Sequence, residues 1–166
     1  MSNGSSLPLG NPSPATGMDE DNCSQHGLRS KPIPLTVRVR YSHVDRMNYL
    51  YHVHYYEYCE WARAEWLRQI YKPYAEIETS GMAIVVTEAE LAYHKPARYD
   101  DLLSITVEPV DWSRSRFKLG YSVHREGEPQ PLFTATTTHC FINSNGKPIP
   151  IPDGLKAVVS THYPQK

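Results

Sequence analysis

The feature that most constrains this chain is a long stretch without helix breakers, from Tyr51 to the residue before Pro73. Apolar side chains recur along it at steps of three and four residues, which places them on one face of an α-helix; they are Tyr55, Cys59, Ala62, Trp66 and Ile70. Pro73 should end the helix, because the residue before a proline disfavours helical backbone angles. The sequence therefore predicts one long amphipathic helix in the first half of the chain.

The remaining positions of this helix indicate how it is covered. Two aromatic residues, Tyr58 and Trp61, lie beside the apolar stripe and widen it, so we expect the helix to be buried on more than one side. The charged residues Glu60, Arg63 and Arg68 lie off the stripe, and we expect Glu60 at the surface or at an interface.

Alternating apolar and polar residues before and after the helix are typical of half-buried β-strands. The expected strands cover residues 35–41, 82–93, 103–107, 117–123 and 133–142, and the last four follow one another at hairpin spacing. This arrangement predicts a mainly antiparallel sheet. Since an apolar helix and a sheet with one apolar face can bury each other's surface, we expect an α+β fold in which the sheet wraps around the central helix.

Composition divides the chain and excludes several classes of protein. Residues 1–31 are rich in Ser, Gly, Asn and Pro and carry an acidic run, so we expect a disordered extension before a single domain over residues 32–166. Met18 is a second candidate translation start. A net charge of −1 gives no general attraction to nucleic acid or anionic membranes, and no apolar run is long enough to span a bilayer.

The three cysteines, Cys23, Cys59 and Cys140, lack the paired spacing of a disulfide framework or a zinc ribbon. The N-terminal residues also lack the apolar core of a secretory signal. We therefore predict a cytoplasmic protein without a nucleic-acid partner and without membrane insertion.

An acidic residue in the loop before the helix suggests chemistry. The first N–H groups of a helix have no partner within it and can stabilise a developing oxyanion. Asp45 lies seven residues before His52, where a carboxylate could attack a carbonyl held at the helix start or deprotonate a water that does so. The alternative is that Asp45 only stabilises the turn.

The segment from Tyr41 to Arg68 resembles the signature of the YbgC-type acyl-CoA thioesterases, in the 4-hydroxybenzoyl-CoA thioesterase group of hotdog-fold proteins. The matching positions begin with a tyrosine, an aspartate and a Tyr-His pair and continue into the helix; they are Tyr41, Asp45, Tyr51, His52, Tyr55, Glu60, Arg63, Glu65, Trp66, Leu67 and Arg68. Further matches extend the resemblance over residues 34–153. Three positions differ from the usual pattern, with Asn48 in place of a glycine, His54 in place of an asparagine, and Asp100 in place of the glycine of a Gly-Asp pair.

This resemblance implies an acyl-CoA thioesterase that needs no cofactor, with a hotdog fold and an active site at the interface of a dimer or homotetramer. Asp45 would be the nucleophile or general base, and the helix start at His52 would polarise the thioester carbonyl. Tyr41 would hydrogen-bond the carboxylate or substrate, although it could instead be a core aromatic residue at the end of a strand. Asn48 tolerates the left-handed backbone that the usual glycine adopts.

Two further groups of residues are candidates for binding sites. Arg114 and Arg116, with Lys118, form a basic cluster that matches the phosphates of coenzyme A, or alternatively a solvated sheet edge. The histidines at positions 43, 52 and 54 suggest a metal site, but residues two apart on a helix point in different directions, so we predict no metal. A hotdog protein that binds acyl-CoA or acyl-carrier-protein thioesters without hydrolysing them is the alternative function.

Overall fold

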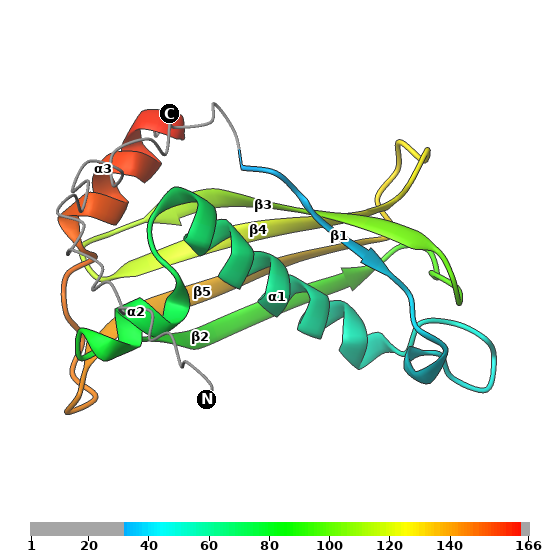
Figure 1. The fold of residues 1–166 in the computed structure, drawn as a ribbon, viewed down its shortest axis with the longest axis horizontal. Helices are drawn as coiled ribbons and strands as arrows, with labels where there is room; N and C mark the ends of the chain where they lie inside the picture. Colours follow the sequence, from blue (N-terminus) through cyan, green and yellow to red (C-terminus); the bar gives the residue numbers. More distant parts are fainter. Residues whose placement is uncertain (1–31, 164–166) are drawn as a thin grey trace, which may run out of the picture.

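The computed structural model describes residues 32–163. They form, in order, β1 (Leu35–Arg38), the 3-10 turn η1 (Tyr41–His43), α1 (His52–Ile70), α2 (Tyr74–Thr79), β2 (Met82–Tyr93), β3 (Leu102–Trp112), β4 (Arg116–Arg125), β5 (Phe133–Asn143) and α3 (Asp153–His162). The strands form one antiparallel sheet in the order β1-β3-β4-β5-β2, and α1 lies across its face (Figure 1). This is the predicted α+β hotdog architecture.

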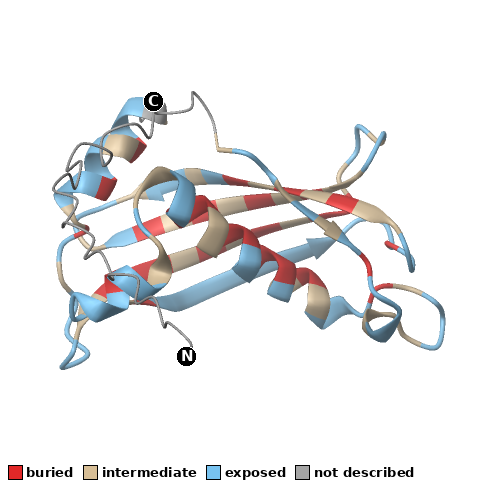
Figure 2. Ribbon diagram, in the orientation of Figure 1, coloured by how far each residue is buried: buried red, intermediate tan, exposed pale blue. Residues whose placement is uncertain are grey.

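The long helix is confirmed and lies as its apolar stripe indicated. Tyr55, Cys59, Ala62 and Trp66 are buried, and Tyr58 is fully enclosed (Figure 2). The inward residues of β3 and β4 alternate with outward ones as predicted and complete the core beneath α1; they are Leu103, Ile105, Val107, Phe117, Leu119, Tyr121 and Val123. The helix and the sheet therefore bury each other's apolar surface.

Two residues of α1 lie differently from the prediction. Arg63 lies off the predicted apolar stripe, yet it is only 4% exposed, because its guanidinium contacts Glu60, His139 and the ring of Tyr74. Trp61 was expected to widen the buried stripe, yet it is 42% exposed. Sequence periodicity missed the burial of Arg63 because its partner Glu60 is itself exposed, so the two residues read like an ordinary surface pair.

The strand order also departs from a run of hairpins. β2 pairs with β5 and not with the following strand β3, so β2 forms one edge of the sheet. A register shift between Val86 and Glu88 interrupts that pairing. From Val85 onward every residue of β2 is exposed, as the pale strand in Figure 2 shows.

The C-terminal helix α3 was not predicted. Its Leu155 and Val159 are buried and line an apolar cavity with Trp66 and Trp112, so α3 closes the end of the core that is far from the start of α1. The expected disorder of residues 1–31 and the choice between Met1 and Met18 lie outside the described residues.

Candidate active site

The loop that carries Asp45 is a closed turn. An isolated bridge joins Val44 to Leu50, and the Asp45 N–H donates to the Tyr49 carbonyl at 2.8 Å. Asn48 has a φ of +61°, so it adopts the left-handed backbone that sequence analysis expected of it. The backbone of this turn therefore holds Asp45 in a defined place.

One carboxylate oxygen of Asp45 is used to stabilise the turn. Its Oδ1 accepts hydrogen bonds from the Met47 N–H at 2.8 Å and the Tyr49 N–H at 3.2 Å. Among residues 32–163, no ion pair involves Asp45 and no hydrogen bond involves its Oδ2. A carboxylate with one anchored oxygen and one free oxygen is suited to attack or to proton transfer.

The start of α1 supplies unpaired N–H groups beside this carboxylate. The helix begins at His52, and the N-cap residue Tyr51 makes no side-chain cap hydrogen bond. The Tyr51 N–H donates to the His43 carbonyl at 2.9 Å, while the described chain offers no acceptor to the His52 N–H. The Tyr93 hydroxyl donates to the His52 carbonyl at 3.2 Å and so ties the end of β2 to the first helical turn.

Asp45 and His52 both line a cleft of about 410 Å³ between the loop, the start of α1 and the end of β2. Its lining combines a carboxylate, a lysine and mainly aromatic or apolar side chains; it consists of Asp45, Met47, Tyr49, Leu50, His52, Tyr55, Tyr93, Lys95 and Pro96. Tyr55 stacks on Phe133 with ring centroids 5.0 Å apart, and its hydroxyl accepts the Ala97 N–H at 2.8 Å, which fixes the inner wall.

The other predicted site residues lie elsewhere in this chain. Tyr41 is 77% exposed in η1, packs edge-on against Tyr99 and does not line the cleft. Arg116 begins β4 and lines a separate cavity of about 260 Å³, and the Arg114 carbonyl accepts the Ile151 N–H near α3. Both arginines are thus at the opposite end of the sheet from Asp45 (Figure 1).

Sequence reasoning did not single out Tyr93 or connect Lys95 with the cleft. Tyr93 is the last residue of β2, and only the pairing of β2 with β5 brings that strand end to the start of α1. No local signal in the sequence reports this contact, because it joins residues 41 positions apart.

Residues 32–163 contain no group of three or more His, Cys, Asp or Glu side chains arranged to hold a metal ion. Within the same residues, no helix is both long and apolar enough to cross a membrane.

The fold agrees with comparisons to known proteins. The family model described as "Thioesterase-like superfamily" matches residues 39–159, which include the Asp45 loop, α1 and the four strands β2, β3, β4 and β5. The chain belongs to the thioesterase-like superfamily. The prediction of a hotdog-fold thioester hydrolase is thereby confirmed at the level of this superfamily.

Two relatives named as thioester hydrolases resemble the chain over different shares of its length. A 1,4-dihydroxy-2-naphthoyl-CoA hydrolase of Thermosynechococcus vestitus is 28% identical over 72% of this chain and 82% of its own. The acyl-CoA thioester hydrolase YbgC of Escherichia coli is 36% identical, over 43% of this chain and 54% of its own.

Solved structures agree in fold. A hypothetical protein from Aquifex aeolicus superimposes with a TM-score of 0.72 at 31% identity, covering 77% of this chain and 99% of its own. A DHNA-CoA thioesterase from Staphylococcus aureus has a TM-score of 0.72 at 25% identity, covering 78% of this chain and 89% of its own.

Proposed function

We propose that this protein is an acyl-CoA thioesterase that uses Asp45 and the start of α1 to cleave an acyl–sulfur bond. The observation that carries the proposal is the cleft in which a carboxylate with one free oxygen faces the same space as the first turn of a helix. Membership of the superfamily supports thioester hydrolysis as the reaction.

The chemistry follows from these groups. The His52 N–H stabilises the negative charge that develops on the thioester carbonyl oxygen. In one route the free oxygen of Asp45 attacks the carbonyl carbon, the thiolate leaves, and water hydrolyses the resulting anhydride. In the other route Asp45 takes a proton from the water that attacks directly. Both routes yield a free acid and a thiol.

The acyl group is best identified by a screen that measures thiol release. The cleft presents three tyrosines together with Leu50 and Pro96, surfaces that suit aliphatic and aromatic acyl groups alike. The screen should compare short, long and aromatic acyl-CoAs, including 1,4-dihydroxy-2-naphthoyl-CoA because a relative is named for it. Matching acyl-carrier-protein thioesters test whether coenzyme A is required.

The exposed edge of β2 supports a homo-oligomer. A long unpaired edge strand with apolar residues is a template for pairing with another chain, and β2 exposes Val85, Val86, Leu91 and Tyr93 by 36% to 49%. Its two glutamates do not present free charges that would oppose pairing with another strand. Glu88 accepts a hydrogen bond from the Thr138 hydroxyl, and Glu90 forms an ion pair with Lys118 on the molecule's own sheet. We infer that two copies pair β2 to β2 in antiparallel fashion.

Sedimentation should therefore show a dimer or larger species at micromolar concentration. Val86→Lys, which places a charge on this edge, should shift the protein towards monomer and lower hydrolysis. Val110→Lys is the matched control, since Val110 is exposed on β3 and away from this edge. A wild-type protein that sediments only as monomer would contradict the inferred pairing.

The same pairing would explain how Arg116 serves a site at the other end of the sheet. Tyr93 of the cleft pairs with Phe133, which pairs with Val123, and Arg116 lies seven residues before Val123. That separation is roughly 23 Å at the rise of a β-strand. Antiparallel pairing of two β2 strands places the Arg116 end of one copy beside the Asp45 end of the other.

Arg116→Ala should then raise the KM for acyl-CoA by about tenfold, the loss of one charge-assisted contact to phosphate. The KM for a short acyl thioester without the nucleotide should change little, because that substrate has no phosphate to bind. Steady-state kinetics on the two substrates check the prediction. Equal effects on both would remove Arg116 from the nucleotide site.

A further inference from the structure

Two histidines connect the Asp45 loop to α1 without lining the cleft. His43 is the last residue of η1, two positions before Asp45, and His54 lies in the first turn of α1. Their rings are stacked, with centroids 4.1 Å apart and planes inclined by 12°. Neither belongs to the residues around the cleft, so hydrolysis as proposed above does not use their side chains.

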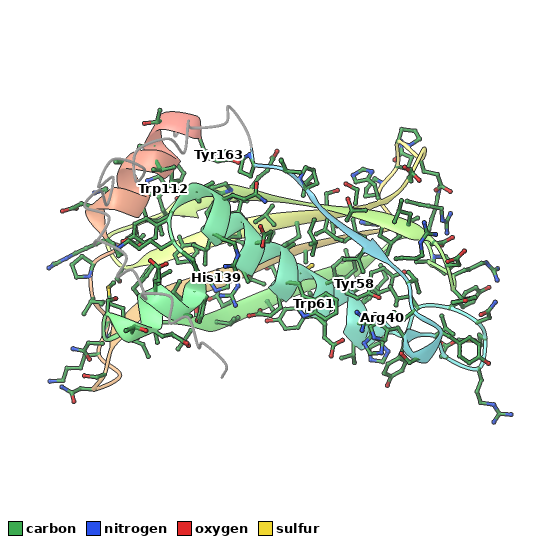
Figure 3. The ribbon with its side chains drawn as sticks, viewed as in Figure 1. Arg40, Tyr58, Trp61, Trp112, His139 and Tyr163 are labelled. Carbon is green, nitrogen blue, oxygen red and sulfur yellow. The ribbon has the colours of Figure 1, made fainter. Side chains whose placement is uncertain are left out.

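His43 is held to the helix by three separate contacts. Its carbonyl accepts the Tyr51 N–H at 2.9 Å, its Nδ1 lies 2.8 Å from the Tyr58 hydroxyl, and its ring covers that of His54. Tyr58 lies in the second turn of α1, beside the loop end marked by Arg40 in Figure 3. These contacts set where the loop, and with it Asp45, lies relative to the start of the helix.

The charges around the two stacked imidazole rings favour a state in which one of the rings is neutral. The groups that face His43 are His54, Tyr58, Arg40 and Glu57. Burial lowers the pKa of His43, and the charges of His54 and Arg40 lower it further, against an opposing effect of Glu57. Burial also raises the pKa of Tyr58 to about 12, so its hydroxyl keeps its proton beside His43.

Among residues 32–163, Glu57 is the one carboxylate that acts on this pair of rings, so it cannot compensate two imidazolium ions. The Glu57 Oε2 lies 2.5 Å from Nδ1 of His54, so it pairs with that ring when His54 is protonated. A second proton on His43 would place like charges in stacked rings, with Arg40 adding a third positive group. Like charges at this distance repel, and partial burial strengthens the repulsion.

We propose that His43 and His54 are positioning residues whose stack holds the Asp45 loop against the first turn of α1 and loosens when both rings are protonated. The inference rests on the proposed role of Asp45. Lowering the pH adds the second proton, so kcat falls on the acidic side before the loop itself unfolds. Displacing Asp45 by about 1 Å is sufficient to lower the rate, because attack requires close alignment.

Two substitutions of His54 separate stacking from charge. At pH 7.5, His54→Ala removes the stack and should lower kcat by about tenfold with KM within about twofold, whereas His54→Phe keeps a flat ring and should stay within about twofold of wild type. At pH 5.5, His54→Phe should retain a larger fraction of its kcat than wild type, because it cannot take the second proton. His124→Ala, which removes a histidine bonded to Ser122 on β4, should follow wild type at both values.

Superimposable pH profiles of wild type and His54→Phe, or an unchanged kcat in His54→Ala, would overturn the proposal. A second measurement does not depend on turnover. In Asp45→Asn protein, NMR titration should show the midpoint of His43 rising when His54→Phe is added, since one neighbouring positive charge is lost. If the wild-type protein hydrolyses no thioester, the proposed function is wrong. The NMR titration still tests the His43–His54 stack in that case, because an unchanged His43 midpoint would reject it.

Discussion

Asp45→Asn should lower kcat for acyl-CoA hydrolysis by at least about a hundredfold, the size expected when a general base or nucleophile is lost. Asparagine keeps the side-chain oxygen that accepts the Met47 and Tyr49 N–H groups, so the turn should persist. What is lost is the negative charge and the free carboxylate oxygen. Thiol release measures the rate, and thermal unfolding tests whether the fold is retained.

Asp153→Asn is the control for this experiment, because Asp153 begins α3 at an exposed position and does not line the cleft. It should leave kcat unchanged. An Asp45→Asn protein with wild-type kcat would rule out the assigned role of Asp45. A protein that binds acyl-CoA tightly while wild type and variant alike fail to hydrolyse it would instead favour a non-catalytic binding protein.

Glu60→Ala should lower the free energy of unfolding by about 2–3 kcal/mol, because it leaves the buried Arg63 charge without a carboxylate. The Arg63 side chain is 5% exposed and pairs with Glu60, and its Nε has no partner among the described residues. His139 cannot replace the lost negative charge, because an imidazole is either neutral or positive. Burial and the nearby Arg63 lower its pKa to about 3, so it stays neutral and offers Arg63 only a hydrogen bond. The ring of Tyr74, 5.6 Å away, offers only a weak cation–π contact.

Glu65→Ala provides the matched comparison on the same helix. Glu65 pairs with Arg68 at the same three-residue spacing, but the two side chains are 41% and 56% exposed. Surface pairs of this kind contribute about 0.5 kcal/mol or less, since water replaces the lost contact. Denaturant unfolding of both variants checks the difference. Equal losses in the free energy of unfolding would show that the burial of Arg63 does not make its ion pair more stabilising than a surface pair.

The parts of the fold that sequence analysis predicted well are those whose signals are local. The stripe from Tyr55 to Trp66 repeats with the period of a helix, and Leu103, Ile105 and Val107 repeat with the period of a strand. The left-handed backbone at Asn48 was also predictable from a single residue, because the short polar side chain of asparagine tolerates a positive φ. Asp45 and His52 could be chosen for the same reason, since a loop acid and a helix start are adjacent in sequence.

The order of strands could not be predicted in this way. Hairpin spacing suggested that β2 would pair with β3, whereas β2 pairs with β5, some 50 residues later in sequence for Val86 and His139. Pairing of that kind depends on the curvature of the whole sheet around α1. The exposed edge of β2, and the place of Tyr93 at the cleft, follow from it.

By itself, the sequence determined that the chain has one long helix and an antiparallel sheet, and that Asp45 lies just ahead of the helix start. Periodicity and turn chemistry act between neighbouring residues, so they can be read directly from the order of amino acids. Only the tertiary structure decided that Arg63 is buried against Glu60, that Tyr93 closes the cleft, and that Arg114 and Arg116 lie at the far end of the sheet. These outcomes depend on which distant segments pack together, and burial depends on that packing and not on residue type alone.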